Sequence, residues 1–359
     1  MNFQVRLATE SDGAALAAFF RRLLIPARVP VAVSRGDDCF ALARLRGGES
    51  YWLLAESDEG GIVGALELAV LPVAIGGGTL TMAYVAFAGV DSAYRRRGVL
   101  LALAARAEPL SRARGSRIGA LLHNKNNLAI EQMMAKYVQR AIAAEPIAVA
   151  TLAASGVLRP SRDYRYEPAR AEDMPAAQAL LRQRHRRYTV APMESLGDML
   201  ARLRLPEDAC WVARTPQGEV AAFLGAWDQQ ALRPIALGRL PALERCARAA
   251  LNLVAPALGL ARLPRDGEAL RLAFALAPAA IDAAALRGLL RAQLRYLASR
   301  GYHGLLLALP RNDSLWPGLA PWWALHNENH PLLVGGDAEA HDLLLARGQP
   351  VLHMEYGLV

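Results

Sequence analysis

Lysine is almost absent from this chain. Of its 41 basic residues only Lys125 and Lys136 are lysines, and the net charge is +8 with an isoelectric point near 9.7. Positive charge of this kind attracts polyanions, but the densest basic stretch outside the turn described below, Arg182 to Arg187, has little aromatic content with which to stack bases. That stretch is typical of a solvated helix face. We therefore expect no nucleic-acid partner.

Cysteines are also few. Cys39, Cys210 and Cys246 are odd in number and widely spaced, which argues against a disulfide framework and gives no metal-binding pattern. The N-terminus lacks a basic start followed by an apolar core and a small-residue cleavage site. The longest apolar stretch, from Ile62 to Ile75, is interrupted by a glutamate and a proline and is too short to cross a bilayer. These absences predict a cytoplasmic protein without a membrane partner.

Only one histidine pair has the spacing of a helical metal site. His326 and His330 are four residues apart, but the H-E-x-x-H order is missing, the tract is rich in asparagine and Pro331 follows at once. We predict no metal.

The most informative segment is a basic turn between an apolar strand and an apolar helix. Its sequence is Tyr-Arg-Arg-Arg-Gly-Val-Leu, residues 94–100. The residues from Met82 to Val90 are typical of a buried strand, and those from Val99 to Ala105 are strong helix formers with apolar residues at helical spacing. The first turn of a helix exposes unpaired N–H groups and partial positive charge. Gly98 lets the main chain approach a phosphate closely, so the turn predicts a pyrophosphate site.

The order of elements around this turn is also informative. A strand at Phe3 to Leu7 precedes a helix that opens at Thr9 to Asp12 with capping residues. Strands from Tyr51 to Glu56 and Ile62 to Val70 flank a glycine-containing hairpin. A short strand from Ile118 to Leu122 follows the helix and reaches Asn124.

This arrangement resembles the GNAT family of N-acetyltransferases over roughly residues 3 to 150. The family's signature is Gln or Arg, two residues, Gly, one residue, then Gly or Ala; here Arg95, Gly98 and Leu100 stand at those places, and Leu100 departs from the small residue. The resemblance implies an α/β fold with a mixed, splayed central sheet flanked by helices, and acetyl-CoA as acyl donor. The cofactor-binding residues that it implies are Ala88, Gly89, Val90, Arg95, Arg96, Arg97, Gly98, Val99, Leu100 and Asn124. Gly89 suits a bulge where the strand approaches the thioester closely.

A second copy of the pattern follows. At 359 residues the chain exceeds what one core usually serves, and residues 166–177 echo residues 6–15, with Asp173 matching Asp12. We expect two tandem GNAT-like domains, residues 1–155 and 156–359, each running strand, helix, hairpin, strand, helix, strand. In the second copy Gly288 follows Arg287 much as Gly98 follows Arg97, but Ala285 stands where Arg95 does. We interpret the second domain as degenerate at this turn, although binding of CoA by its backbone alone stays open.

The resemblance implies direct attack of an amine on the thioester, without a covalent enzyme intermediate. Proximity and oxyanion stabilisation would supply much of the rate. Family members often carry an acidic base on the strand that here runs from Met82 to Val90, which has none. The candidates are Tyr84 on that strand, Glu67 on its neighbour, and Tyr137, which is similar to the family's tyrosine that protonates the leaving thiolate. The alternative for Tyr84 is a packed aromatic, and for Glu67 a position on the solvent face.

The acceptor is open at this stage. By resemblance, residues 26–48 border its cleft, where Arg28, Arg35, Asp37 and Asp38 either select a charged substrate or lie in an exposed loop. A small primary amine is the default and a protein amine the second choice. The competing hypothesis is a non-catalytic scaffold that binds acyl-CoA or a partner. The sequence does not indicate an oligomeric state.

Overall fold

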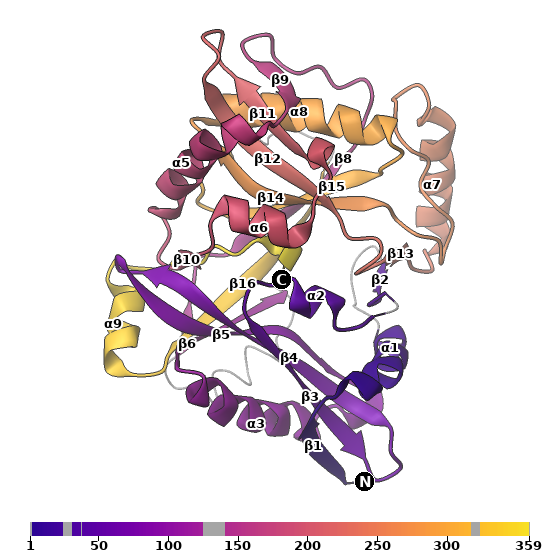
Figure 1. Cartoon of the computed structure of the whole chain (residues 1–359). Helices are drawn as coiled ribbons and strands as arrows, with labels where there is room; N and C mark the ends of the chain where they lie inside the picture. The colour runs from indigo at the N-terminus through magenta and orange to yellow at the C-terminus, as the bar shows by residue number, and fades with distance from the viewer. Residues whose placement is uncertain (1, 24–30, 37, 125–140, 317–323, 359) are drawn as a thin grey trace.

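The computed structural model describes residues 2–23, 31–36, 38–124, 141–316 and 324–358. Its centre is a mixed sheet of 14 strands that runs through both halves of the chain, with helices on its faces (Figure 1). In spatial order its main path is β1 (Phe3–Leu7), β3 (Glu49–Ser57), β4 (Ile62–Ile75), β5 (Gly78–Val90), β6 (Ser116–Asn124), β16 (Ala324–Gly335), β8 (Ile147–Ala153), β15 (Gly304–Pro310), β14 (Leu272–Ala280), β12 (Val220–Asp228), β11 (Cys210–Arg214) and β9 (Arg165–Pro168). The predicted fold class, a mixed sheet flanked by helices, is confirmed.

Two short strands lie off this path and two more form a separate pair. They are β7 (Ala141–Ala143) on β16, β10 (Ala191–Pro192) on β4, and the pair β2 (Val31–Val33) and β13 (Ile235–Leu237). The α-helices of the described residues are α1 (Gly13–Arg22), α2 (Ala41–Arg44), α3 (Val99–Ala113), α5 (Met174–His185), α6 (Leu196–Leu203), α7 (Ala242–Val254), α8 (Ala283–Ser299) and α9 (Ala338–Leu345). Among these none is long and apolar enough to cross a membrane.

The two halves repeat the same local order. In the first, β4 and β5 form an antiparallel hairpin and β5 pairs parallel with β6 after the crossover helix α3. In the second, β12 is antiparallel to β14, and β14 is parallel to β15 after α8. The matched acidic residues make equivalent contacts. The Asp12 carboxylate accepts a hydrogen bond from the Thr9 amide, and the Asp173 carboxylate accepts one from the Arg170 amide, each capping a short helical turn.

The halves exchange strands at their junction. Strand β16, near the C-terminal end of the chain, lies between β6 and β8, and β8 pairs on its other side with β15 of the second half. Strand β16 of the second half thus pairs with β6 of the first, and β8 of the first half pairs with β15 of the second. The sheet is therefore continuous between the two halves. The division into domains at residue 155 stays a prediction.

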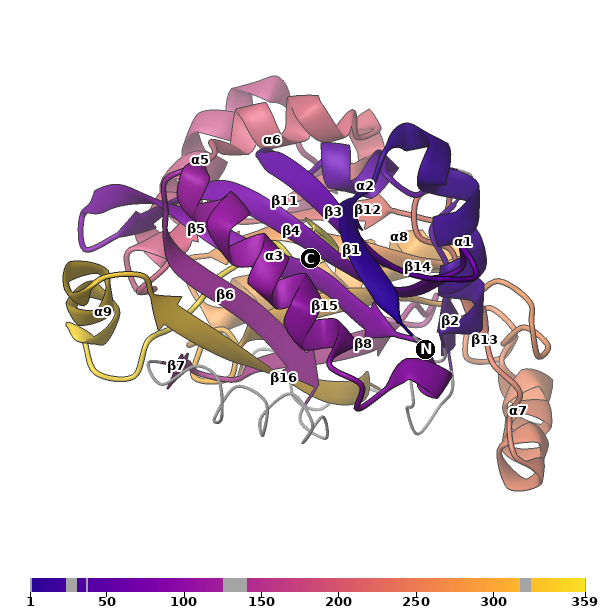
Figure 2. The ribbon, with the colours of Figure 1, turned by 90° about the horizontal axis from the view of Figure 1, so that it is seen from below.

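Packing follows from the alternation of side chains along the strands. In the first half α3 covers one face of β4 through Val99 and Leu103, which contact Leu66 and Leu68, while Phe19 and Phe20 of α1 pack beside Ala65 on the other face (Figure 2). Gly64 allows this close approach of α3, because a Cβ there would lie 2.6 Å from Val99 Cγ1.

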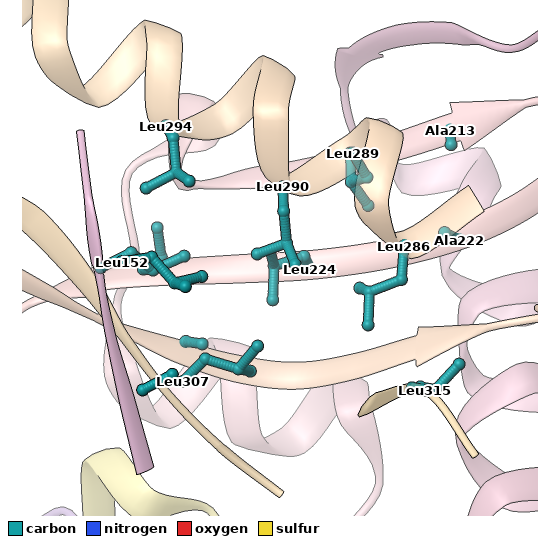
Figure 3. Close-up of a cluster of buried hydrophobic side chains, with 14 of the residues drawn as sticks. Leu152, Ala213, Ala222, Leu224, Leu286, Leu289, Leu290, Leu294, Leu307 and Leu315 are labelled. Atoms are coloured by element: carbon teal, nitrogen blue, oxygen red, sulfur yellow. The ribbon is translucent and has the colours of Figure 1, made fainter. Parts of the chain in front are cut away.

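In the second half the leucines of α8 form the corresponding layer. Figure 3 shows Leu286, Leu289, Leu290 and Leu294 pointing from the helix toward the strands that carry Leu224, Leu307 and Leu152. Leu152 belongs to β8, a strand of the first half. This core therefore packs β8 against the second half.

Candidate functional site

The basic turn has the conformation that its glycine implied. The chain leaves β5, passes a short 3-10 turn at Ser92–Tyr94, and enters α3 with Gly98 as the N-cap residue at φ 80° and ψ 3°. Nothing lies within 4 Å of a Cβ placed on Gly98, an exposed position, so the left-handed backbone rather than packing favours the glycine. Arg96 also has a positive φ, 62°.

The start of α3 is open to an anion. Its first hydrogen bond inside the helix runs from the Ala102 amide to the Gly98 carbonyl at 2.9 Å, so the N–H groups of Val99, Leu100 and Leu101 precede any helical acceptor. The side chains of Arg95, Arg96 and Arg97 are exposed around this end, whereas Val99 is buried and anchors the helix. The Arg97 guanidinium lies 5.6 Å from the centre of the Tyr94 ring, and Arg95 Nε donates to the Val90 carbonyl at 3.4 Å.

Strands β5 and β6 separate as they approach the turn. Their parallel ladder runs from Thr81 opposite Ser116 to Val85 opposite Leu121, and both strands continue beyond it. Over the rest of β5, from Ala86 to Val90, the main chain has no ladder partner on that side among the described residues. This is the splayed geometry predicted for the strand pair beside the turn.

The bulge lies at Ala86 rather than at Gly89. On β4, Glu67 pairs with Phe87 and Leu68 pairs with Val85, so Ala86 is the extra residue. Gly89 stands in the regular ladder opposite Ala65. A Cβ on Gly89 would lie 2.7 Å from Leu23 Cδ1 and 2.8 Å from Phe87 Cζ, so packing explains the glycine and the expectation of a bulge there was wrong.

Asn124 lies at the end of the splayed strand β6, exposed and opposite Asn329 of β16. Its side-chain oxygen accepts a hydrogen bond from Asn327 Nδ2 at 3.3 Å. Strand β16 therefore positions Asn124, a predicted cofactor-binding residue. Tyr137, the predicted acid, lies outside the described residues.

Glu67 does not lie on the solvent face. Its side chain is 0 % exposed, and its carboxylate forms an ion pair with Arg46 and lies 3.7 Å from Arg35 Nη2. Arg46 Nε also donates to the Leu358 carbonyl near the C-terminal end of the chain. Burial lowers the pKa of both guanidinium groups. The solvent-face alternative was wrong. The buried carboxylate is compensated by Arg46 and Arg35, which come from an irregular part of the chain outside β4.

Arg35 is held by aromatic rings rather than exposed in a loop. Its guanidinium lies 5.6 Å from the centre of the Phe20 ring, 5.9 Å from that of Trp52 and 6.0 Å from that of Phe87. Of the other charged residues predicted near the acceptor cleft, Asp38 pairs with Arg44 at the surface, and Arg28 and Asp37 lie outside the described residues.

Tyr84 is a buried aromatic residue on β5. It is 1 % exposed and belongs to a core cluster on one face of the sheet, with Met82, Ile118, Ala120 and Leu344 of α9. Its burial agrees with the packed-aromatic alternative and leaves its chemical role untested.

A small cavity, with about 70 Å³ of space for water-sized groups, lies between the halves. Arg46 and Met82 line it from the first half, and α5, α6, residues 353–355 and Leu358 line it from the second. Apolar side chains form most of its wall: Leu71, Val73, Met82, Leu181, Met193, Leu196, Met199, Met354 and Leu358.

The basic stretch at the end of α5 was predicted to be a solvated helix face. This prediction is wrong for Arg184, which is buried and whose Nη2 lies 3.0 Å from Asp313 Oδ2 in an ion pair.

The corresponding helix of the second half, α8, does not begin with a matching open turn. Helix α8 begins at Ala283, and the Asp282 carboxylate caps it by accepting the Ala285 amide at 2.8 Å. A carboxylate at this end repels a phosphate. Gly288 lies inside the helix, where a Cβ would come 1.9 Å from Tyr166 Oη, so its match to Gly98 in the sequence does not make it a helix start. Backbone binding of CoA at Gly288 is therefore not supported.

Comparison with known proteins agrees with this geometry. Residues 41–123 match the model of the acetyltransferase (GNAT) domain, so the predicted resemblance is confirmed. A search of curated proteins gave no match.

Among solved structures, similarity extends over nearly the whole chain. N-myristoyltransferase of Saccharomyces cerevisiae with bound myristoyl-CoA has a TM-score of 0.57 at 10 % identity, covering 93 % of this chain and 82 % of that one. The glucosamine N-acetyltransferase region of a fungal multi-domain β-N-acetylglucosaminidase has a TM-score of 0.61 at 12 % identity, covering 92 % of this chain and 38 % of that one. A GCN5-related N-acetyltransferase from Anabaena variabilis has a TM-score of 0.51 at 12 % identity, covering 94 % and 74 %. At these identities the similarity establishes the fold.

Proposed function

We propose that this chain is an N-acyltransferase that moves an acetyl group from acetyl-CoA to a primary amine of a small molecule. The GNAT acyltransferase fold and an acyl-CoA donor are the premise. The observation that carries the proposal is the open, cationic N-terminus of α3 beside the splay of β5 and β6. We place the protein in the cytoplasm.

The cofactor would run along β5. Its pyrophosphate would bind the free N–H groups at Val99 and Leu100, with Arg95 and Arg96 adding charge. The pantetheine arm would then enter the splay beside Ala88, Gly89 and Val90, and the thioester would reach the bulge at Ala86. Asn124 on the facing strand would contact the cofactor from the other side.

The reaction would be a direct displacement. The amine nitrogen attacks the thioester carbonyl carbon, the negative charge on oxygen is stabilised by main-chain N–H groups at the bulge, and the C–S bond breaks to release the CoA thiolate. Tyr137 is our candidate to protonate that thiolate. Glu67 and Tyr84 remain candidates for proton transfer, although the Glu67 carboxylate is already paired with Arg46 and lies 3.7 Å from Arg35 Nη2.

A small amine as acceptor is supported by one similar structure, which is named a glucosamine N-acetyltransferase. A protein amine is the second choice, since another is an N-myristoyltransferase.

An acyl chain longer than acetyl is a second candidate for the donor. The cavity contains Met82, which lies on β5 four residues before the bulge and so on the side away from the pyrophosphate turn. A chain extending from the thioester in that direction would meet apolar side chains. A comparison of acetyl-, hexanoyl- and decanoyl-CoA as donors distinguishes the two: a clear preference for the longer chains would replace acetyl in the proposal.

A non-catalytic acyl-CoA-binding scaffold is the alternative, favoured by the absence of a carboxylate on β5 and by the ion-paired state of Glu67. A thiol-release assay with acetyl-CoA and a panel of amines separates turnover from binding. We expect free thiol with at least one small amine. Thermal protection by CoA without thiol release from any amine or acyl donor would establish the scaffold instead.

The site itself is tested by the double variant Arg95→Ala, Arg96→Ala. Two lost guanidinium contacts to phosphate should weaken CoA binding by about tenfold or more, most strongly at low salt. Arg106→Ala, on the exposed side of the same helix, is the matched control and should bind CoA as the unmodified protein does. Equal affinities for all three proteins would place the pocket elsewhere.

A further inference from the structure

A cluster of two histidines and a glutamate lies in the wall of the cavity. His185, His353 and Glu355 each present a ligand atom, and these atoms all lie within 4.8 Å of one another. His185 is the last residue of α5, on the face that buries Ala177 and Leu181. The other two lie two residues apart in the segment that follows α9, so the tertiary fold brings the three together.

Two members of the cluster are fixed by their surroundings. The His353 ring stacks on Tyr188 with the ring centres 4.8 Å apart, and its Nε2 lies 3.4 Å from Glu355 Oε1. The other carboxylate oxygen of Glu355 accepts the Ala277 amide at 2.9 Å. The Ala277 amide is an outer contact of the kind that orients carboxylate ligands in metal sites.

The third member has a ring nitrogen available. His185 Nε2 is buried and forms no hydrogen bond with any described residue, which is costly for a polar atom inside a protein. The His185 ring centre lies 5.1 Å from that of His353. A bound cation would satisfy this nitrogen and bring the three ligand atoms to tetrahedral spacing.

We propose that His185, His353 and Glu355 bind a divalent transition-metal ion of the zinc type. Two imidazoles and one carboxylate are a common zinc ligand set, with the fourth position open to water or another ligand, and here that position faces the cavity. The charge states suit the proposal: burial lowers the pKa of His185 to about 3, so the imidazole is neutral at neutral pH. Burial opposes ionisation of Glu355, but hydrogen bonds from His353 and the Ala277 amide outweigh it and lower its pKa.

The site does not depend on acyl transfer, so its test uses metal binding alone. Full-length protein is stripped with a chelator and titrated with Co²⁺ while visible d–d absorption is recorded, and zinc content after dialysis against Zn²⁺ is measured by elemental analysis. We expect one equivalent of metal per chain and absorption typical of tetrahedral cobalt.

Two conservative variants test the ligands. His185→Gln changes a partly exposed position, and Glu355→Gln keeps an oxygen that can accept the Ala277 amide. Both variants should therefore fold. The thermal midpoint of each metal-free variant checks this. Each should lower metal affinity by at least about tenfold. His326→Gln, at an exposed histidine on β16, is the control and should leave affinity unchanged. The proposal fails if the unmodified protein binds no Co²⁺ or Zn²⁺ above background, or if His185→Gln and Glu355→Gln bind these ions as the control does.

Discussion

Arg46 and Glu67 form an ion pair from which solvent is almost completely excluded: the two side chains are 1 % and 0 % exposed. The pair links the irregular segment after α2 to the strand opposite the bulge, since Glu67 is the ladder partner of Phe87. Arg35 approaches the same carboxylate from the aromatic cluster. One carboxylate therefore neutralises part of the charge of two buried guanidinium groups beside the site where the thioester would lie.

Glu67→Gln should be strongly destabilising. The substitution leaves two buried guanidinium groups without their counter-ion, and breaking a buried pair in this way costs about 3–5 kcal/mol. Urea unfolding measures the loss in the free energy of unfolding. The control is Glu49→Gln on β3, an exposed glutamate 3.4 Å from Arg114, which should change stability by less than about 0.5 kcal/mol.

The same variant separates a structural role from proton transfer. If Glu67 serves only as counter-ion to Arg46 and Arg35, the folded fraction of Glu67→Gln should show the same shape of the pH profile of kcat/KM as the unmodified protein. Loss of the acidic limb of that profile would make Glu67 the general base and contradict the structural interpretation.

Gly98→Ala tests the left-handed N-cap of α3. Because Gly98 has a φ of 80° and open space around it, an added Cβ strains only the backbone, which costs about 1–2 kcal/mol. Relief of that strain would move the main-chain amides, so CoA affinity should fall as well. Gly218→Ala is the matched control, since Gly218 has a φ of 90° and equal open space in the hairpin between β11 and β12.

Chemical denaturation and CoA titration of both variants give the result. We expect similar losses of stability but weakened CoA binding for Gly98→Ala alone. Equal CoA affinities for the two variants would argue that the amides at this turn do not contact the cofactor.

Local signals in the sequence were sufficient for several elements of the first half and for this turn. The hairpin between β3 and β4, the capping residues at Thr9 and Asp12, and the glycine before α3 each act within a few residues, so their effect can be predicted from a short stretch. The cationic turn of the first half and its absence in the second followed from the same local comparison.

The strand exchange had no local signal. Strand β6 pairs with β16, from Ile118 opposite Gly335 to Asn124 opposite Asn329, across more than half of the chain. Such pairing is decided by which apolar edges meet after folding, and alternation within either strand does not specify the partner. The burial of Glu67 could not be predicted for a related reason: its strand is covered on both faces, so the charge is explained only by the distant arginines.

His185 should make stability depend on pH in the metal-free protein. Burial, assisted by the charge of His353, lowers its pKa from 6.5 to about 3 in the folded state. Below pH 6.5 the unfolded chain binds a proton that the folded chain excludes, so stability is full above that pH and falls as the pH decreases toward 3. Between pH 7 and pH 5 this group accounts for a loss of about 2 kcal/mol.

Urea unfolding of the chelator-treated protein at pH 7 and pH 5 checks this value against His185→Gln. The variant should lose about 2 kcal/mol less over that range, because all other titrating groups are shared. Parallel losses in the two proteins would show that the imidazole takes up its proton in the folded state.

Gly288→Ala should damage the scaffold and leave the cofactor site intact. A Cβ at this position would lie 1.9 Å from Tyr166 Oη, inside the core between α8 and β9, and overpacking of this kind costs about 1–3 kcal/mol. Because Gly288 lies within α8 and the helix start is capped by Asp282, CoA affinity and a stoichiometry of one CoA per chain should be unchanged. Calorimetric titration with CoA and urea unfolding measure the two effects separately. A loss of CoA binding in this variant, or a second equivalent of CoA in the unmodified protein, would mean that the second half also binds the cofactor and that the carboxylate cap does not exclude it.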